Sequence, residues 1–158
     1  MKWLEEANKL IGIKEFAAPK SNPLIVQMWK DIKRGGIKDD KTPWCAAFVG
    51  ACLERVGIVS TRFESAKSYL KWGVTLERPV EGCIAVFDRD GGGHVGFVVG
   101  VDRVGNYQIL GGNQGDAVKV AAFPRSRNPQ FRWPDGIAIP SAPLPMWDKG
   151  APVSTKES

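Results

Sequence analysis

The sequence predicts an α+β domain in which N-terminal helices pack against an antiparallel β-sheet. The first observation behind this prediction is the spacing of apolar residues before Gly73, which follows the three- to four-residue period of amphipathic helices. The second is the change after Gly73 to an alternation of period two, which is typical of strands. The third is that short turns rich in Gly and Asp separate the strand-like segments, as they do between antiparallel neighbours.

Four helices and five strands are expected in order along the chain. The third helix should be the central one, because it is apolar almost throughout and carries charge only at Glu54 and Arg55. The expected helices cover residues 2–11, 23–32, 43–56 and 64–72, and the expected strands cover residues 83–87, 94–101, 106–110, 117–123 and 130–133.

Length and composition fit one domain followed by a tail. The chain has 158 residues, of which 43% are apolar and 25% charged, enough for a substantial core. We expect the domain to cover residues 1–134 and a Pro-rich tail to cover residues 135–158. The tail shows no obvious partner surface in the core, and docking as an extended segment through Trp147 is the less favoured alternative.

The chain carries a mild basic excess, with 22 Lys and Arg against 17 Asp and Glu and a net charge of +5. Such a charge fits an anionic partner such as cell-wall polymer, nucleic acid or a membrane surface. No run of like charges is present, so nucleic-acid binding is not favoured over a surface that is charged for solubility alone. No segment is apolar over the length of a membrane span, so stable membrane insertion is not expected.

Cys45 is the candidate nucleophile. Thr42 suits the N-cap position and Pro43 the first helical position, which makes Cys45 the third residue of the expected helix. A thiol there feels the positive end of the helix dipole, which favours the thiolate. Neighbouring backbone N–H groups have no partner within the helix and can donate to an oxyanion.

The candidate base is His94, the one histidine of the chain. If residues 94–101 and 106–113 pair around the turn at 102–105, His94 lies opposite Asn113. Directly opposed residues have Cβ atoms about 4.5–5.5 Å apart, so the Asn113 amide oxygen could hold an imidazole N–H, as in Cys-His-Asn proteases.

Two further residues could orient the base. Gln114 is the alternative to Asn113, although its side chain should point to the other face of the strand, and Asp116 is a candidate if the loop curls back. Glycines before His94 and before Asn113 should leave the site open to a substrate backbone.

Substrate contacts are assigned to three residues. Glu15 is a candidate for binding rather than for chemistry, and Gln114 is a second. Trp44, next to Cys45, is equally compatible with a wall of the substrate groove and with a core tryptophan.

The other cysteines are interpreted as core residues. Cys52 lies on the same helix face as Cys45, and Cys83 lies in an apolar strand. An odd count of three cysteines argues against a disulfide framework. No closely spaced cysteine pair is present, so neither a metal nor another cofactor is expected.

Three sequence blocks stand out when they are taken together in this order. They are Thr42-Pro43-Trp44-Cys45-Ala46-Ala47-Phe48-Val49, Gly93-His94-Val95-Gly96-Phe97-Val98-Val99-Gly100 and Leu110-Gly111-Gly112-Asn113-Gln114. As a set they resemble the NlpC/P60 and CHAP superfamily of papain-like cysteine peptidases and amidases, and in particular small phage and prophage cell-wall hydrolases. The resemblance covers about residues 4–134. One departure is Glu81-Gly82-Cys83, where relatives commonly have Pro-Gly-Asp.

The resemblance implies a papain-like fold and a thiolate mechanism with Cys45 as nucleophile, His94 as base and Asn113 as the third polar residue. It implies peptidoglycan as the substrate, with cleavage of an amide bond in or next to the stem peptide. Both an N-acetylmuramoyl-L-alanine amidase and an endopeptidase fit these motifs.

Residues 1–16 show no signal-peptide pattern. The expected role is therefore that of an endolysin, a monomer made in the host cytoplasm that reaches the cell wall through a holin and causes host lysis. One alternative is an injected antibacterial amidase effector of the same fold with a cognate immunity protein. The other is a non-catalytic phage structural or wall-binding module.

Overall fold

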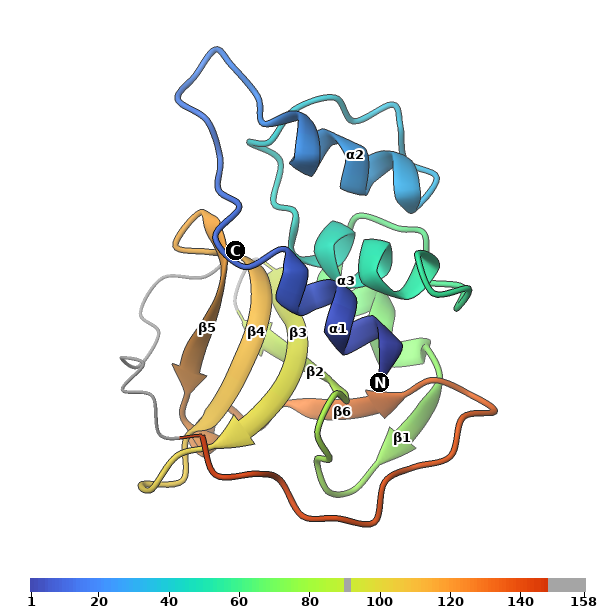
Figure 1. Ribbon diagram of the computed structural model, residues 1–158, viewed down its shortest axis with the longest axis vertical. Coiled ribbons are helices and arrows are strands. Elements are labelled where there is room, and N and C mark those ends of the chain that lie inside the picture. Colours follow the sequence, from blue (N-terminus) through green and yellow to red (C-terminus); the bar gives the residue numbers. More distant parts are fainter. Residues whose placement is uncertain (90–91, 148–158) are drawn as a thin grey trace.

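The computed structural model describes residues 1–89 and 92–147. In this part of the chain a six-stranded antiparallel sheet has the strand order β1-β6-β2-β3-β4-β5, and α1 and α3 lie against one side of it (Figure 1). The predicted α+β fold with an antiparallel sheet is confirmed. The helices are α1 (Lys2–Lys9), α2 (Pro23–Asp31), α3 (Cys45–Glu54) and the short 3-10 helices η1 (Ala66–Lys71) and η2 (Arg125–Arg127). The strands are β1 (Val74–Leu76), β2 (Ile84–Arg89), β3 (Gly92–Val101), β4 (Tyr107–Gln114), β5 (Ala117–Phe123) and β6 (Gln130–Trp133).

The start of α3 differs from the prediction. The helix begins at Cys45 with Trp44 as its N-cap residue, whereas Thr42 and Pro43 lie in the preceding turn. The reason is Asp39, whose Oδ1 atom accepts a hydrogen bond from the Thr42 N–H at 2.7 Å and so stabilises a turn there. Cys45 is therefore the first residue of the helix instead of the third.

Helix α3 is the centre of the core. All of its residues from Cys45 to Leu53 are buried, as its continuous apolar sequence predicted. Its first turn presses on β4 at Gly112. A Cβ atom on that glycine would lie 2.6 Å from the Phe48 Cβ and 2.8 Å from the Trp44 ring. The missing side chain thus lets the N-terminus of α3 approach the sheet closely.

The predicted pairing of β3 with β4 is correct over part of its length. Phe97 pairs with Leu110 and Val98 with Ile109, which is the register that would place His94 opposite Asn113. The β3–β4 ladder ends at Phe97, however, and the β4–β5 register shifts between Gly111 and Gln114. An irregularity at the end of β4 therefore interrupts the alternation on which the prediction relied.

The beginning of the predicted tail is docked, contrary to the expectation. Residues 134–147 run around the edge of the molecule and return to the end of β3 (Figure 1). Val101 donates its N–H to the Pro145 carbonyl at 3.1 Å, and the Trp147 N–H donates to the Val101 carbonyl at 2.8 Å. Since β2 leaves β3 at the Ile84–Phe97 pair, the tail satisfies backbone groups that β2 does not reach. The rest of the tail lies outside the described residues, and the domain boundary at 134 stays a prediction.

Strand β1 was not predicted, because three residues are too few for a periodic signal. The core placement of Cys52 and Cys83 is confirmed, since both are free cysteines with fully buried side chains. Burial raises the pKa of the Cys83 thiol to about 12 and raises that of Cys52 as well, so neither thiol is reactive. Among the described helices, none has the length and apolarity needed to cross a membrane.

Substitution of Gly112 by Ala tests the close approach of α3 to β4. The added methyl group would meet the Phe48 Cβ and the Trp44 ring, so we expect the free energy of unfolding to fall by about 1–3 kcal/mol. Urea denaturation measures the change. Gly36→Ala is the matched control, because a Cβ there has no neighbour within 4 Å. Equal stability of the two variants would contradict the packing described here.

Candidate active site

Cys45 and His94 come together where the N-terminus of α3 meets the first residues of β3. Both side chains are buried, with 3% of Cys45 and 0% of His94 exposed. Burial raises the pKa of the Cys45 thiol, but a hydrogen bond and the charge of His94, together with the backbone N–H groups of Val95 and Ala46, outweigh it. The pKa of Cys45 therefore lies below its ordinary value, and the thiolate is favoured.

The His94 ring is held on its face and at one edge. It stacks on Phe123 with ring centroids 5.5 Å apart and an interplanar angle of 13°, and Phe87 lies against it at 6.3 Å. The ring atom Nε2 lies 2.8 Å from Oε1 of Gln114. Stacking and the hydrogen bond together fix both the plane of the imidazole and its rotation within that plane.

The contacts of Gln114 determine which ring nitrogen carries the proton. The Gln114 amide nitrogen donates to the carbonyls of Ile109 at 3.1 Å and Lys119 at 2.7 Å. The opposite orientation of the amide would point its oxygen at two carbonyl oxygens, so Oε1 must face His94 as an acceptor. Nε2 of His94 is then the N–H donor. Nδ1, free of this proton in the neutral ring, serves Cys45.

The hydrogen-bond partner predicted for His94 was wrong. Asn113 does not hold the ring, since its Oδ1 atom is buried without a hydrogen-bond partner. Its backbone has a φ of 58°, a left-handed conformation that Asn adopts more readily than most residues. This conformation ends the regular alternation of β4 and turns Gln114 toward His94. The pair Gly111-Gly112 just before Asn113 was the signal for such an irregularity.

Two of the three predicted substrate contacts lie inside the protein. Trp44 and Gln114 are both 0% exposed, so Trp44 takes the core position that the sequence left open, and Gln114 serves His94. Glu15 is only partly buried, and its Oε2 atom accepts the Trp44 indole N–H at 3.1 Å. Burial raises the pKa of Glu15, the Trp44 hydrogen bond opposes that shift, and Asp116 and Asp40 add to it. The sequence had not placed Glu15 near Trp44 or Cys45.

The glycines before Asn113 were expected to open the site to solvent, but they are buried, whereas a Cβ atom on Gly92, before His94, would have no neighbour within 4 Å. A Cβ atom on Gly111 would lie 2.4 Å from Gln114 Oε1 and 3.3 Å from His94 Nε2. Gly96 is likewise covered by Ile109. These glycines make room for the protein's own side chains, including the Gln114–His94 contact.

A cavity of about 670 Å³ lies elsewhere, between the docked tail and the end of β3 at Val101. None of Cys45, His94 and Gln114 lines it, so it is separate from this site. Among residues 1–89 and 92–147, no cluster of three or more His, Cys, Asp or Glu side chains is arranged to hold a metal ion.

The CHAP domain family matches residues 37–113 of the chain. The match includes Cys45 and His94 and ends at Asn113, one residue before Gln114. The match is consistent with the CHAP and NlpC/P60 superfamily that the sequence motifs resemble. CHAP domains are typically cysteine- and histidine-dependent amidohydrolases, and a CHAP domain suggests peptidoglycan hydrolase or amidase activity. No curated protein and no solved structure matches the chain significantly.

The pH at which Cys45 becomes reactive tests the contact with His94. We expect iodoacetamide to alkylate Cys45 with a pH midpoint below that of a free cysteine, about 8.5. In His94→Ala the hydrogen bond and charge are lost while burial remains, so the midpoint should rise above that value. Mass spectrometry locates the label, and Cys52 and Cys83 should stay unmodified in the folded protein. Equal midpoints in wild type and His94→Ala would contradict the contact.

A second pair of variants distinguishes the role of Gln114 in holding His94 from that of Asn113. Gln114→Leu removes the acceptor that holds His94 Nε2, so the alkylation midpoint of Cys45 should rise by roughly one pH unit. Asn113→Gly keeps the left-handed backbone and should leave the midpoint unchanged. The opposite ranking of the two variants would restore Asn113 as the partner of His94.

Proposed function

We propose that this protein is a cysteine hydrolase that cleaves an amide bond in or next to the stem peptide of peptidoglycan. The observation that carries the proposal is the buried pair of Cys45 and His94, with the thiol pKa lowered and the imidazole held in one tautomer by Gln114. The CHAP match supports peptidoglycan as the substrate class.

The proposed chemistry begins with transfer of the Cys45 proton to Nδ1 of His94. The thiolate attacks the amide carbonyl and forms a tetrahedral intermediate. His94 then donates the proton to the leaving amine, which departs and leaves a thioester on Cys45. Water, deprotonated by His94, hydrolyses the thioester and regenerates the free thiol. Throughout this cycle Gln114 accepts from Nε2–H, so only Nδ1 exchanges protons.

The helix terminus provides the oxyanion donor in this scheme. The first hydrogen bond within α3 joins the Phe48 N–H to the Trp44 carbonyl at 2.9 Å, so the Cys45 N–H has no acceptor within the helix. Placing Cys45 at the first helical position, as the structure does, directs that N–H toward the same end of the helix as the thiol. The net charge of +5 supports approach to an anionic wall polymer.

The direct test is whether the protein clears suspensions of outer-membrane-permeabilised Gram-negative cells or of their purified peptidoglycan. The loss of turbidity measures the clearance. Wild type should clear the wall and Cys45→Ala should not, because the nucleophile is gone. Cys52→Ala is the matched control, since it removes a buried cysteine from the same helix without touching the site. Mass spectrometry of the released fragments identifies the bond and separates an amidase from an endopeptidase.

Clearance by Cys45→Ala at the wild-type rate would show that another group performs the chemistry. Failure of wild type on every wall preparation would remove peptidoglycan as the substrate and favour a non-catalytic module.

We also propose the endolysin role, in which the protein meets the wall after a holin has opened the inner membrane. The small catalytic domain and its basic charge support this role. Expression with and without a holin in a Gram-negative host tests it. Rapid lysis that needs both the holin and Cys45 is the expected result, and lysis without a holin would contradict the role.

A further inference from the structure

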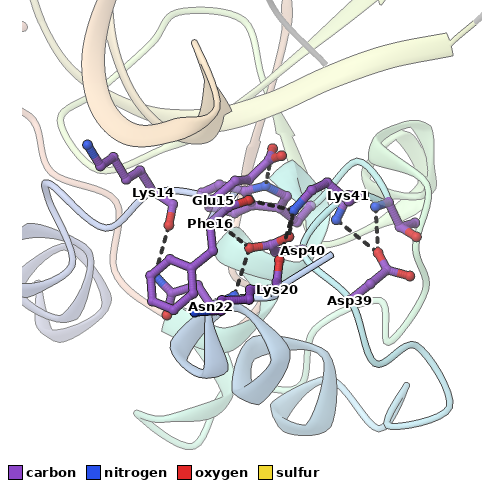
Figure 2. Close-up of polar contacts among 10 residues, drawn as sticks. Lys14, Glu15, Phe16, Lys20, Asn22, Asp39, Asp40 and Lys41 are labelled. Carbon is purple, nitrogen blue, oxygen red and sulfur yellow. Dashed lines mark hydrogen bonds and ion pairs between the residues drawn. The ribbon is translucent and has the colours of Figure 1, made fainter. Parts of the chain in front are cut away.

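The turn before α3 contains a charged pair that the proposed chemistry does not use. The Asp40 carboxylate is completely buried, with 0% of its side chain exposed, and it forms an ion pair with the ammonium group of its neighbour Lys41. The Lys41 side chain is 42% exposed, so solvent reaches one side of the pair. Figure 2 shows Asp40 close to Phe16, Lys20 and Asn22, with Lys41 beside it.

Both members of the pair bind the backbone of one segment, residues 14–22, which we call the anchor loop. Asp40 Oδ2 accepts the N–H groups of Phe16 at 2.8 Å and Asn22 at 2.7 Å. Lys41 Nζ donates to the carbonyls of Phe16 at 2.7 Å and Lys20 at 3.3 Å. The ammonium group is thus surrounded by three oxygen atoms, as a bound cation would be (Figure 2).

The anchor loop in turn touches both halves of the candidate active site. Glu15 accepts the indole N–H of Trp44, the residue just before Cys45. The Glu15 N–H donates to the Asp116 carbonyl at 3.0 Å, and Lys14 pairs with Ala117 at the start of β5. Asp116 lies two residues beyond Gln114, which holds His94. One short segment therefore connects the nucleophile's helix to the hairpin of the base.

We propose that Lys41 is a positioning residue for Cys45, and that its ammonium group acts as an internal cation which fixes the anchor loop and thereby keeps Cys45 aligned with His94. This inference rests on the proposed catalytic pair, but it concerns the geometry of the pair and not the identity of the substrate.

The charge of Lys41 is needed because Asp40 is buried. Burial alone raises the pKa of Asp40, whereas Lys41 and the N–H groups of Phe16 and Asn22 lower it below its ordinary value. Without the ammonium group a buried carboxylate would lose its counter-ion, and two backbone carbonyls would lose their donor. The anchor loop would then loosen, and with it the Glu15–Trp44 contact beside Cys45.

The test uses Lys41→Ala, with Lys41→Arg as the conservative variant and Lys38→Ala as the matched control. Lys38 lies in the same loop and is exposed, and its side chain forms no hydrogen bond or ion pair with the described residues. The readout is the pH midpoint of Cys45 alkylation. A variant that only makes Cys45 more accessible to the reagent raises the alkylation rate at every pH by the same factor, so it leaves the midpoint unchanged. His94 is the titratable group whose charge acts on this thiol.

We expect the pH midpoint of Cys45 alkylation in Lys41→Ala to rise by roughly one pH unit, toward that of a free cysteine, about 8.5. Lys41→Arg and Lys38→Ala should keep the wild-type midpoint. Propylammonium chloride, a free cation of the same kind, should lower the midpoint of Lys41→Ala again, whereas NaCl at equal ionic strength should not. Circular dichroism and urea denaturation test whether the variants are folded. If Lys41→Ala is unfolded, Lys41→Gln takes its place.

A wild-type midpoint in the neutral variant, an equal shift in Lys38→Ala, or equal effects of propylammonium and sodium would each overturn the proposal. Because alkylation needs no wall substrate, a shifted midpoint in a protein that fails to clear the wall supports the positioning role and counts against the proposed function alone.

Discussion

The structure depends on the burial of α3 against β3 and β4. This helix has no polar face, so it is stable only when the sheet and the two other N-terminal α-helices surround it. Its tight fit at Gly112 fixes the depth at which its N-terminus meets the sheet. Cys45 is the first residue of that terminus, so the packing that stabilises the domain also places the candidate nucleophile beside His94. A reactive thiolate in such a dry setting requires the compensating hydrogen bonds that the site provides.

The site also shows how a neutral amide can orient a histidine ring. Gln114 uses its two donor contacts to the sheet to present its oxygen to His94, so the backbone of β4 and β5 indirectly sets the tautomer of the imidazole. A neutral acceptor orients the ring without fixing a full negative charge beside it, which leaves the proton exchange to Nδ1 and the thiol. The anchor loop extends this control outward, from the hairpin that follows Gln114 to the tryptophan that precedes Cys45.

Much of the fold could be predicted from periodicity, because the change from helical to alternating spacing follows from burial alone. The helices followed by strands β2 to β6, the central position of α3 and the register near Phe97 were predicted correctly, whereas β1 was not predicted. The start of α3 was not, because the competing turn depends on Asp39, whose side-chain contact has no sequence period. Docking of the tail was the less favoured alternative for a similar reason, since the partner of the tail is a stretch of backbone that β2 leaves unpaired.

The sequence predicted the cysteine and the histidine of the candidate site, but it assigned the wrong hydrogen-bond partner to the histidine. Cys45 and His94 were singled out by a helix start and by the chain's one histidine, and the structure brings them together. Asn113 was chosen by extending a regular ladder, whereas its left-handed backbone breaks that ladder and presents Gln114 instead. Glu15 and the pair of Asp40 and Lys41 could not be placed near the site, because they reach it through loops whose path no local pattern specifies.

The measurement that tests the central claim most directly is the nitrogen-15 NMR spectrum of the His94 side chain as a function of pH. Since the chain has one histidine, its ring signals need no separate assignment. If Gln114 fixes the tautomer, Nε2 keeps its proton over the whole titration while Nδ1 gains and loses one. A spectrum in which Nε2 loses its proton and Nδ1 keeps it would contradict the account, because His94 could then not take the proton from Cys45.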